Sequence, residues 1–181
     1  MENSEESKKI NVRDWIILST TMIGAVLTIL ALIWQVSPTS GIVSATFLLM
    51  LSFVLFVNSV SANSKAYFEA KSGKIPETRI NSFVTFAEYS FGLGFTLVIT
   101  GFAILGYKYL MDFTGGALIA LILPVAFLIT AWIMILIYNA ISYAGKILSW
   151  FRSAKRILWV VLEIVCLAII FLDFMGIILI P

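Results

Sequence analysis

The chain has 181 residues, a formal net charge of +2 and a hydrophobic fraction of 61%, whereas only 12% of its residues are charged. Soluble domains are about 45–50% apolar and about 25% charged. The composition therefore excludes a soluble enzyme and a disordered chain, and it indicates an integral membrane protein. The small net charge and the scattered basic residues do not favour nucleic-acid binding.

Missing residue types exclude several kinds of chemistry. The sequence contains no histidine, which excludes a histidine-ligated zinc or haem site and a Ser-His-Asp triad. The single cysteine, Cys166, cannot form an intramolecular disulfide. We predict no cofactor, no bound metal and no enzymatic activity.

Residues 1–13 are polar and rich in charged side chains, and we interpret them as a partly disordered cytoplasmic tail. This segment is too acidic for the start of a signal peptide, and no small-residue cleavage site follows the first apolar run. Residues 14–181 are predicted to form a single transmembrane domain.

Five long apolar segments follow the tail. A helix needs about 20 mainly apolar residues to cross the hydrocarbon core, and these segments lack the alternation of a membrane-spanning strand. We therefore predict an all-α bundle of five transmembrane helices, at about 14–36, 38–60, 82–107, 115–142 and 157–180.

Proline and glycine residues mark the expected ends of these helices. Pro38 suits the first position of the second helix, which should continue beyond the membrane to about residue 72 and end at Gly73. The third helix should begin at about residue 77, giving a short cytoplasmic helical hairpin. Pro124 should kink the fourth helix, because it removes one backbone hydrogen bond.

The basic residues predict the orientation. With the N-terminus inside and the C-terminus outside, the outer segments contain only Lys108. Such a bias is the positive-inside signal of a multi-pass cell-membrane protein. The eleven basic residues of the inner segments are Lys8, Lys9, Arg13, Lys65, Lys71, Lys74, Arg79, Lys146, Arg152, Lys155 and Arg156.

Residues 144–155 combine apolar and basic positions at helical spacing, which predicts a short helix in the inner membrane interface. Its basic residues are candidates for contact with anionic lipid headgroups. The alternative is a plain connector that obeys the positive-inside rule. The candidate headgroup contacts are Lys146, Arg152, Lys155 and Arg156.

Three acidic residues lie inside the predicted spans: Glu88, Glu163 and Asp173. Intramembrane acids are costly to bury and are functional candidates by default. No lysine or arginine is expected at their depth. Spacings of three, four and three place Glu163, Cys166, Ile170 and Asp173 on one face of the last helix.

Two interpretations of these acids remain open. Together with polar residues such as Asn58 and Thr96, they could mark a path for a cation or a proton. Alternatively, Glu88 and Glu163 pair with arginines near the inner surface, and Asp173 stays protonated and bonds to Asn, Ser or Thr of a neighbouring helix.

Small residues recur at intervals of four in two predicted helices. Thr20, Gly24 and Thr28 lie on one face of the first, and Ser90 and Gly94 on one face of the third. This spacing permits close contact between helices, either within one chain or between copies.

These observations favour a small channel or transporter for a cation or a proton. Because five helices enclose little space, we expect such a protein to be a homo-oligomer in the lipid bilayer. The alternative is a non-transporting accessory or assembly subunit of a membrane complex.

Overall fold

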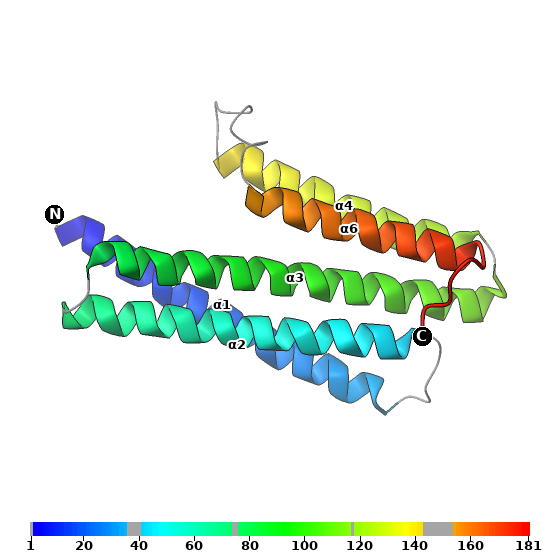
Figure 1. Ribbon diagram of the computed structural model, residues 1–181, viewed down its shortest axis with the longest axis horizontal. Helices are drawn as coiled ribbons and strands as arrows, with labels where there is room; N and C mark the ends of the chain where they lie inside the picture. Colours follow the sequence, from blue (N-terminus) through cyan, green and yellow to red (C-terminus); the bar gives the residue numbers. More distant parts are fainter. Residues whose placement is uncertain (1, 36–40, 74–75, 117, 143–153) are drawn as a thin grey trace. The chain divides into compact units, whose positions relative to one another are not determined.

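The computed structural model describes residues 2–35, 41–73, 76–116, 118–142 and 154–181, which form five α-helices and no strand (Figure 1). The predicted all-helical class is confirmed. Within the described residues, three helices are long and apolar enough to cross a membrane, and a fourth has a shorter apolar stretch, Ile119–Ile133. The helices are α1 (Glu2–Ile33), α2 (Ile42–Ser72), α3 (Glu77–Thr114), α4 (Ile119–Ser142) and α6 (Ala154–Phe174).

The starts of the first two helices differ from the prediction. Residues 2–13, which we expected to be a partly disordered tail, continue the helix α1. Helix α2 begins at Ile42, so Pro38 does not occupy its first position. Pro38 itself lies outside the described residues, as does most of the predicted interfacial helix at 144–155.

Glycines end two of the helices in the left-handed conformation. Gly73 follows α2 with a φ of 64°, and its N–H donates to the carbonyl of Glu69 at 3.2 Å, which confirms it as the predicted C-terminal cap. Gly115 has a φ of 65° and ends α3 at Thr114, seven residues beyond the predicted end. The third helix is therefore longer at both ends than its apolar run.

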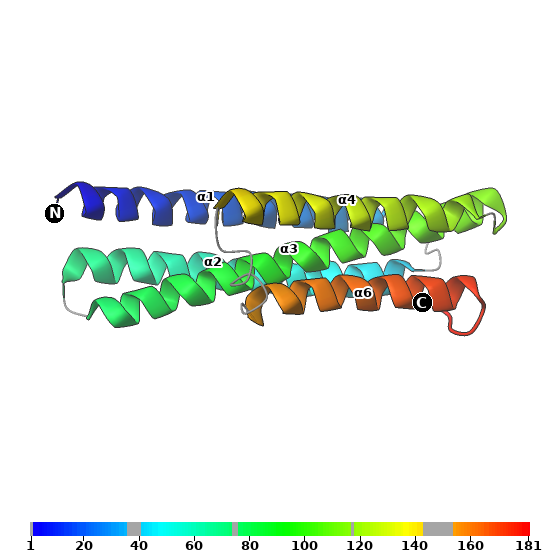
Figure 2. The same ribbon diagram turned by 90° about the horizontal axis from the view of Figure 1, so that it is seen from above.

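The last helix is shorter than predicted. Helix α6 ends at Phe174, and the chain turns at Gly176, whose φ is 71°. The N–H of Ile177 donates to the carbonyl of Leu172 at 2.9 Å and closes the turn. Residues 175–181 then turn back and run toward the start of α2 instead of extending α6 to residue 180 (Figure 1 and Figure 2).

The chain divides into two compact units, and α2 and α3 contribute to both. The first unit comprises Met1–Gln35 and Leu49–Phe95. In its interior the hydroxyls of Ser19 and Ser59 lie 3.2 Å apart. A Cβ atom added at Gly94 would lie 3.1 Å from the ring of Phe56, so α2 and α3 are in close contact there. This contact is of the kind predicted from the small residues.

The second unit comprises Val36–Leu48 and Thr96–Pro181. Its helices α4 and α6 contact each other. Pro124 lies inside α4, which continues as a helix on both sides of it, and the kink stays a prediction. The apolar core of this unit consists of Ile99, Ala103, Ile104, Tyr107, Leu128, Cys166, Ile170 and Ile180.

Candidate functional site

A buried polar cluster lies in the second unit, where α3 and α6 bring together residues far apart in the sequence. The Nζ of Lys108 donates to both carboxylate oxygens of Asp173, at 2.8 Å each. The hydroxyl of Tyr107 donates to Oδ2 of the same carboxylate at 2.7 Å. The side chains of Lys108 and Asp173 are only 7% and 3% exposed, so the ion pair is shielded from its surroundings.

Residues 175–181, the returning segment after α6, complete this cluster. The N–H of Ile180 donates to Oδ1 of Asp173 at 2.7 Å. One residue later, the carbonyl of Pro181 accepts the N–H of Ser44, in the first turn of α2, at 3.1 Å. The carboxylate of Asp173 therefore accepts hydrogen bonds from an ammonium group, a phenol and a backbone amide, and such charge-assisted bonds are the stronger kind.

Gly41 explains how the aliphatic part of Lys108 fits beside the start of α2. A Cβ atom added at Gly41 would lie 2.5 Å from the Cγ of Lys108, a distance that real Cβ atoms do not reach. Gly41 also has a φ of 85°, a conformation that side chains disfavour. Both facts favour glycine at position 41, beside the aliphatic part of Lys108.

The burial of Asp173 against protein was expected, but its partner was not. We predicted no base at its depth and a bond to Asn, Ser or Thr, whereas it pairs with Lys108. The error comes from the predicted lengths of two helices. We expected Lys108 to lie beyond the third helix and Asp173 to lie well inside the last one, whereas α3 continues to Thr114 and α6 ends at Phe174, so the two residues meet.

Glu163 is the second buried acid of α6. With 5% exposure it is buried, as are Cys166, Ile170 and Asp173, which confirms the predicted shared face. Its Oε1 has no hydrogen-bond partner in the part of the chain that the structure describes, and the same holds for Nε1 of Trp159, one turn earlier on that helix. Glu163 thus keeps unused capacity to accept a proton or a hydrogen bond.

The other candidates of the proposed path are divided between the two units. Glu88 and Asn58 belong to the first unit and are exposed. Thr96 belongs to the second and is buried, and its carbonyl accepts the hydroxyl of Thr100 at 2.9 Å. Thr96, Glu163 and Asp173 are therefore buried in the second unit, and among the described side chains Asp173 pairs with a base, Lys108.

The basic candidates for lipid headgroups have no described side chains. Lys146 and Arg152 lie outside the described residues, whereas Lys155 and Arg156 lie in the first turn of α6, where only the backbone is described. In the described part of the chain, no group of three or more Cys, Asp or Glu residues could hold a metal ion.

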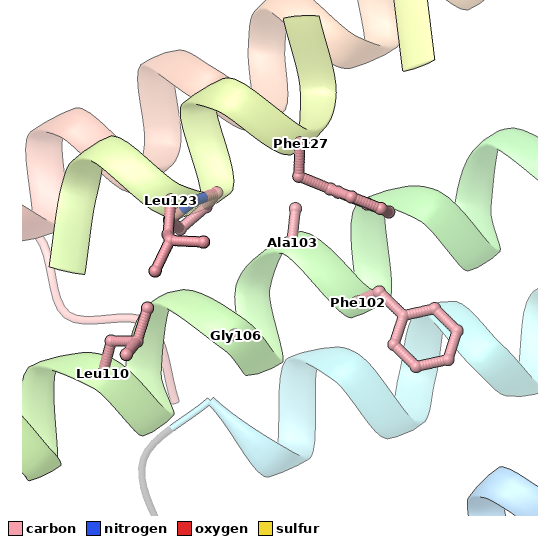
Figure 3. Close-up of a pocket in the computed structure, with 7 residues that line it drawn as sticks. Phe102, Ala103, Gly106, Leu110, Leu123 and Phe127 are labelled. Atoms are coloured by element: carbon pink, nitrogen blue, oxygen red, sulfur yellow. The ribbon is translucent and has the colours of Figure 1, made fainter. Parts of the chain in front are cut away.

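An apolar groove of about 460 Å³ lies between α3 and α4 in the second unit. Leu123 and Phe127 of α4 face Ala103 and Gly106 of α3 across it (Figure 3). No pattern in the sequence marks this groove, because its residues are ordinary for membrane helices. Its lining residues are Phe102, Ala103, Gly106, Leu110, Leu123, Pro124 and Phe127.

No family model, curated protein or solved structure matches this chain. Its function is therefore inferred from its residues and their geometry.

Proposed function

We propose that the chain is a multi-pass cell-membrane protein with five transmembrane helices, the N-terminus in the cytoplasm and the C-terminus outside. The three long apolar helices and the apolar stretch of α4 support this proposal. The charge distribution supports the orientation, since Lys108 is the only basic residue of the outer segments. Because Lys108 is paired with Asp173, the pair as a whole is neutral. A basic residue outside is therefore compatible with the positive-inside rule.

Within this topology we propose a non-transporting role, as an accessory or assembly subunit of a membrane complex. The observation that carries this proposal is the Asp173 cluster. A carboxylate on an ion path must exchange its partner for the ion, whereas Asp173 is bound by Lys108, Tyr107 and the N–H of Ile180. These contacts suit a group that joins the returning segment to α3 and α6, and they oppose a role in conduction.

Reconstitution into liposomes tests this proposal directly. Vesicles containing the purified chain should show no more cation or proton flux than protein-free vesicles. Asp173→Asn should lower the thermal stability of the protein and leave the flux unchanged. Mild purification from native membranes should give the chain in fixed stoichiometry with a second membrane protein. A specific flux through the unmodified chain would contradict this role.

One observation favours transport as a second candidate. The buried Oε1 of Glu163 lacks a hydrogen-bond partner in the described residues. A buried polar group without a partner lowers the stability of the fold, and proteins keep such a destabilising group where their function needs it. In this alternative, Glu163 carries a proton or contacts a cation in a homo-oligomer, and Asp173 is structural.

The two candidates differ in the behaviour of Glu163→Gln. If the chain transports, this variant should lose flux while its fold and oligomeric state remain intact. Asp173→Asn then serves as the matched control, because it should lower stability instead. If the chain is an accessory subunit, neither substitution changes a flux that is already absent.

A further inference from the structure

The returning segment, residues 175–181, is apolar along its whole length. It contains no charged, hydroxyl or amide side chain. The side chain of Ile180 is buried, whereas Met175, Ile177 and Leu179 are 58%, 66% and 80% exposed. Turns and loops on an aqueous surface are rich in Asn, Asp and Ser as well as Gly and Pro, so this composition does not suit contact with water.

The backbone of the returning segment uses most of its hydrogen-bond donors within the chain. Five of the six N–H groups of residues 175–180 donate to protein oxygens, and Pro181 has no N–H. Four of the five donate to carbonyls of the last turn of α6, and the fifth, from Ile180, donates to Asp173. Non-helical backbone in contact with lipid must find its partners inside the protein, and this segment largely meets that condition.

The same hydrogen bonds fix the level of the segment along α3. Its last two residues bond to Asp173 and to Ser44, and Asp173 pairs with Lys108 of α3. Helix α3 continues for six residues beyond Lys108, to Thr114, which is about 9 Å along its axis. Figure 1 shows the segment running back from the end of α6 toward the start of α2. The segment therefore returns to a level well short of the end of α3.

We infer that residues 175–181 form a re-entrant segment in the outer leaflet of the membrane, where Ile177 and Leu179 contact the hydrocarbon chains of lipids. The inference rests on the proposed topology and deepens it. That topology places the C-terminus on the outer side, and the inference places the returning segment within the leaflet instead of in the water beyond it.

The backbone distinguishes lipid from the two other possible surroundings. Water supplies acceptors to the free N–H groups of a surface loop, and a partner protein can do the same through added backbone hydrogen bonds. Hydrocarbon supplies none. A segment with exposed apolar side chains and N–H groups already bonded within its own chain therefore fits lipid best.

Spin labels at single cysteines test this position in the full chain. Each cysteine is introduced in a Cys166→Ala background, and the labelled protein is reconstituted into phosphatidylcholine vesicles. Electron paramagnetic resonance then measures how often each label collides with oxygen, which concentrates in lipid, and with a water-soluble nickel chelate. The ratio of the two collision rates is high for a label in lipid and low for a label in water.

We expect Ile177→Cys and Leu179→Cys to give a ratio several-fold higher than Asp112→Cys, which is exposed on α3 beyond Lys108. Val54→Cys is the matched control for contact with lipid, because Val54 is 52% exposed on the long apolar helix α2. All four positions are exposed, so a label at any of them leaves the interior of the protein unchanged.

Two results would overturn the inference. A ratio at positions 177 and 179 as low as that at position 112 would place the segment in water. Low collision rates with both reagents would place it against protein, and dipolar broadening of the spectrum would identify that protein as a second copy. In both cases Val54→Cys still reports lipid. A low ratio at position 54 itself would instead contradict the proposed membrane location.

Discussion

The Nζ of Lys108 lies 2.8 Å from both carboxylate oxygens of Asp173, although the two residues are 65 positions apart. The pair connects the last part of α3 to the end of α6, and the bond from Ile180 to the same carboxylate fixes the returning segment. Several parts of the second unit therefore depend on one buried charge pair.

Removing one member of this pair should destabilise the protein strongly. Lys108→Met leaves Asp173 buried without its cation, which typically costs about 3–5 kcal/mol of unfolding free energy. The double variant Lys108→Met/Asp173→Leu should lose less than either single variant, because no unpaired charge remains. Unfolding in detergent micelles measures both effects. Lys71→Met, at an exposed position, is the control and should change the free energy of unfolding by less than about 0.5 kcal/mol. If the double variant lost the sum of the two single losses, the coupling between Lys108 and Asp173 would be disproved.

The backbone N–H of Ile180 should contribute separately from its side chain. Ile180→Pro removes both the N–H that bonds to Asp173 at 2.7 Å and the buried side chain. Ile180→Ala removes only the packing. A hydrogen bond to a charged group is worth about 1.5–3 kcal/mol, so the proline variant should be less stable than the alanine variant by about this amount. Equal thermal stability of the two variants would show that the bond is unimportant.

Two glycines should respond oppositely to substitution. Gly24→Ala should raise stability by up to about 1 kcal/mol, because alanine favours the helix and nothing opposes its Cβ. Gly94→Val should lower stability, since the contact of an added Cβ with Phe56 at 3.1 Å is already tight. Thermal melting of the two variants beside the unmodified chain provides the comparison. A stabilised Gly94→Val would contradict the close contact of α2 and α3.

In the unmodified protein, the buried carboxylate of Glu163 should lower the free energy of unfolding. Glu163→Leu removes an acceptor that has no partner in the described residues, and it should raise the unfolding free energy by about 1–3 kcal/mol. Glu163→Gln keeps a polar group of similar size and should gain less. Chemical unfolding of both variants gives the difference. A marked loss of stability in Glu163→Leu would mean that the carboxylate has a stabilising partner.

The orientation can be tested with single cysteines in a Cys166→Ala background. Lys71→Cys and Ser149→Cys should react with a membrane-impermeant maleimide only from the cytoplasmic side. Asp112→Cys should react only from outside. Position 112 is preferable to 108, because Asp112 is exposed whereas Lys108 is buried in its ion pair. Labelling of positions 71 and 112 from the same side would contradict the proposed topology.

The sequence by itself determined the helical class and the approximate positions of the helices. Long apolar runs are a local property, and Gly73 stops α2 through its own backbone preference. The shared buried face of Glu163, Cys166, Ile170 and Asp173 also followed from helical spacing. These features could be predicted because they depend on residues less than a few turns apart.

Only the tertiary structure decided which partner Asp173 has and where α6 ends. Apolar residues continue to Ile180, so hydropathy alone extends the helix, whereas the turn at Gly176 returns the chain and delivers the N–H of Ile180 to Asp173. Lys108, which hydropathy assigns to an outer loop, lies inside α3 and pairs with Asp173. The free energy of this pairing comes from groups far apart in the sequence, and no local pattern encodes their distance.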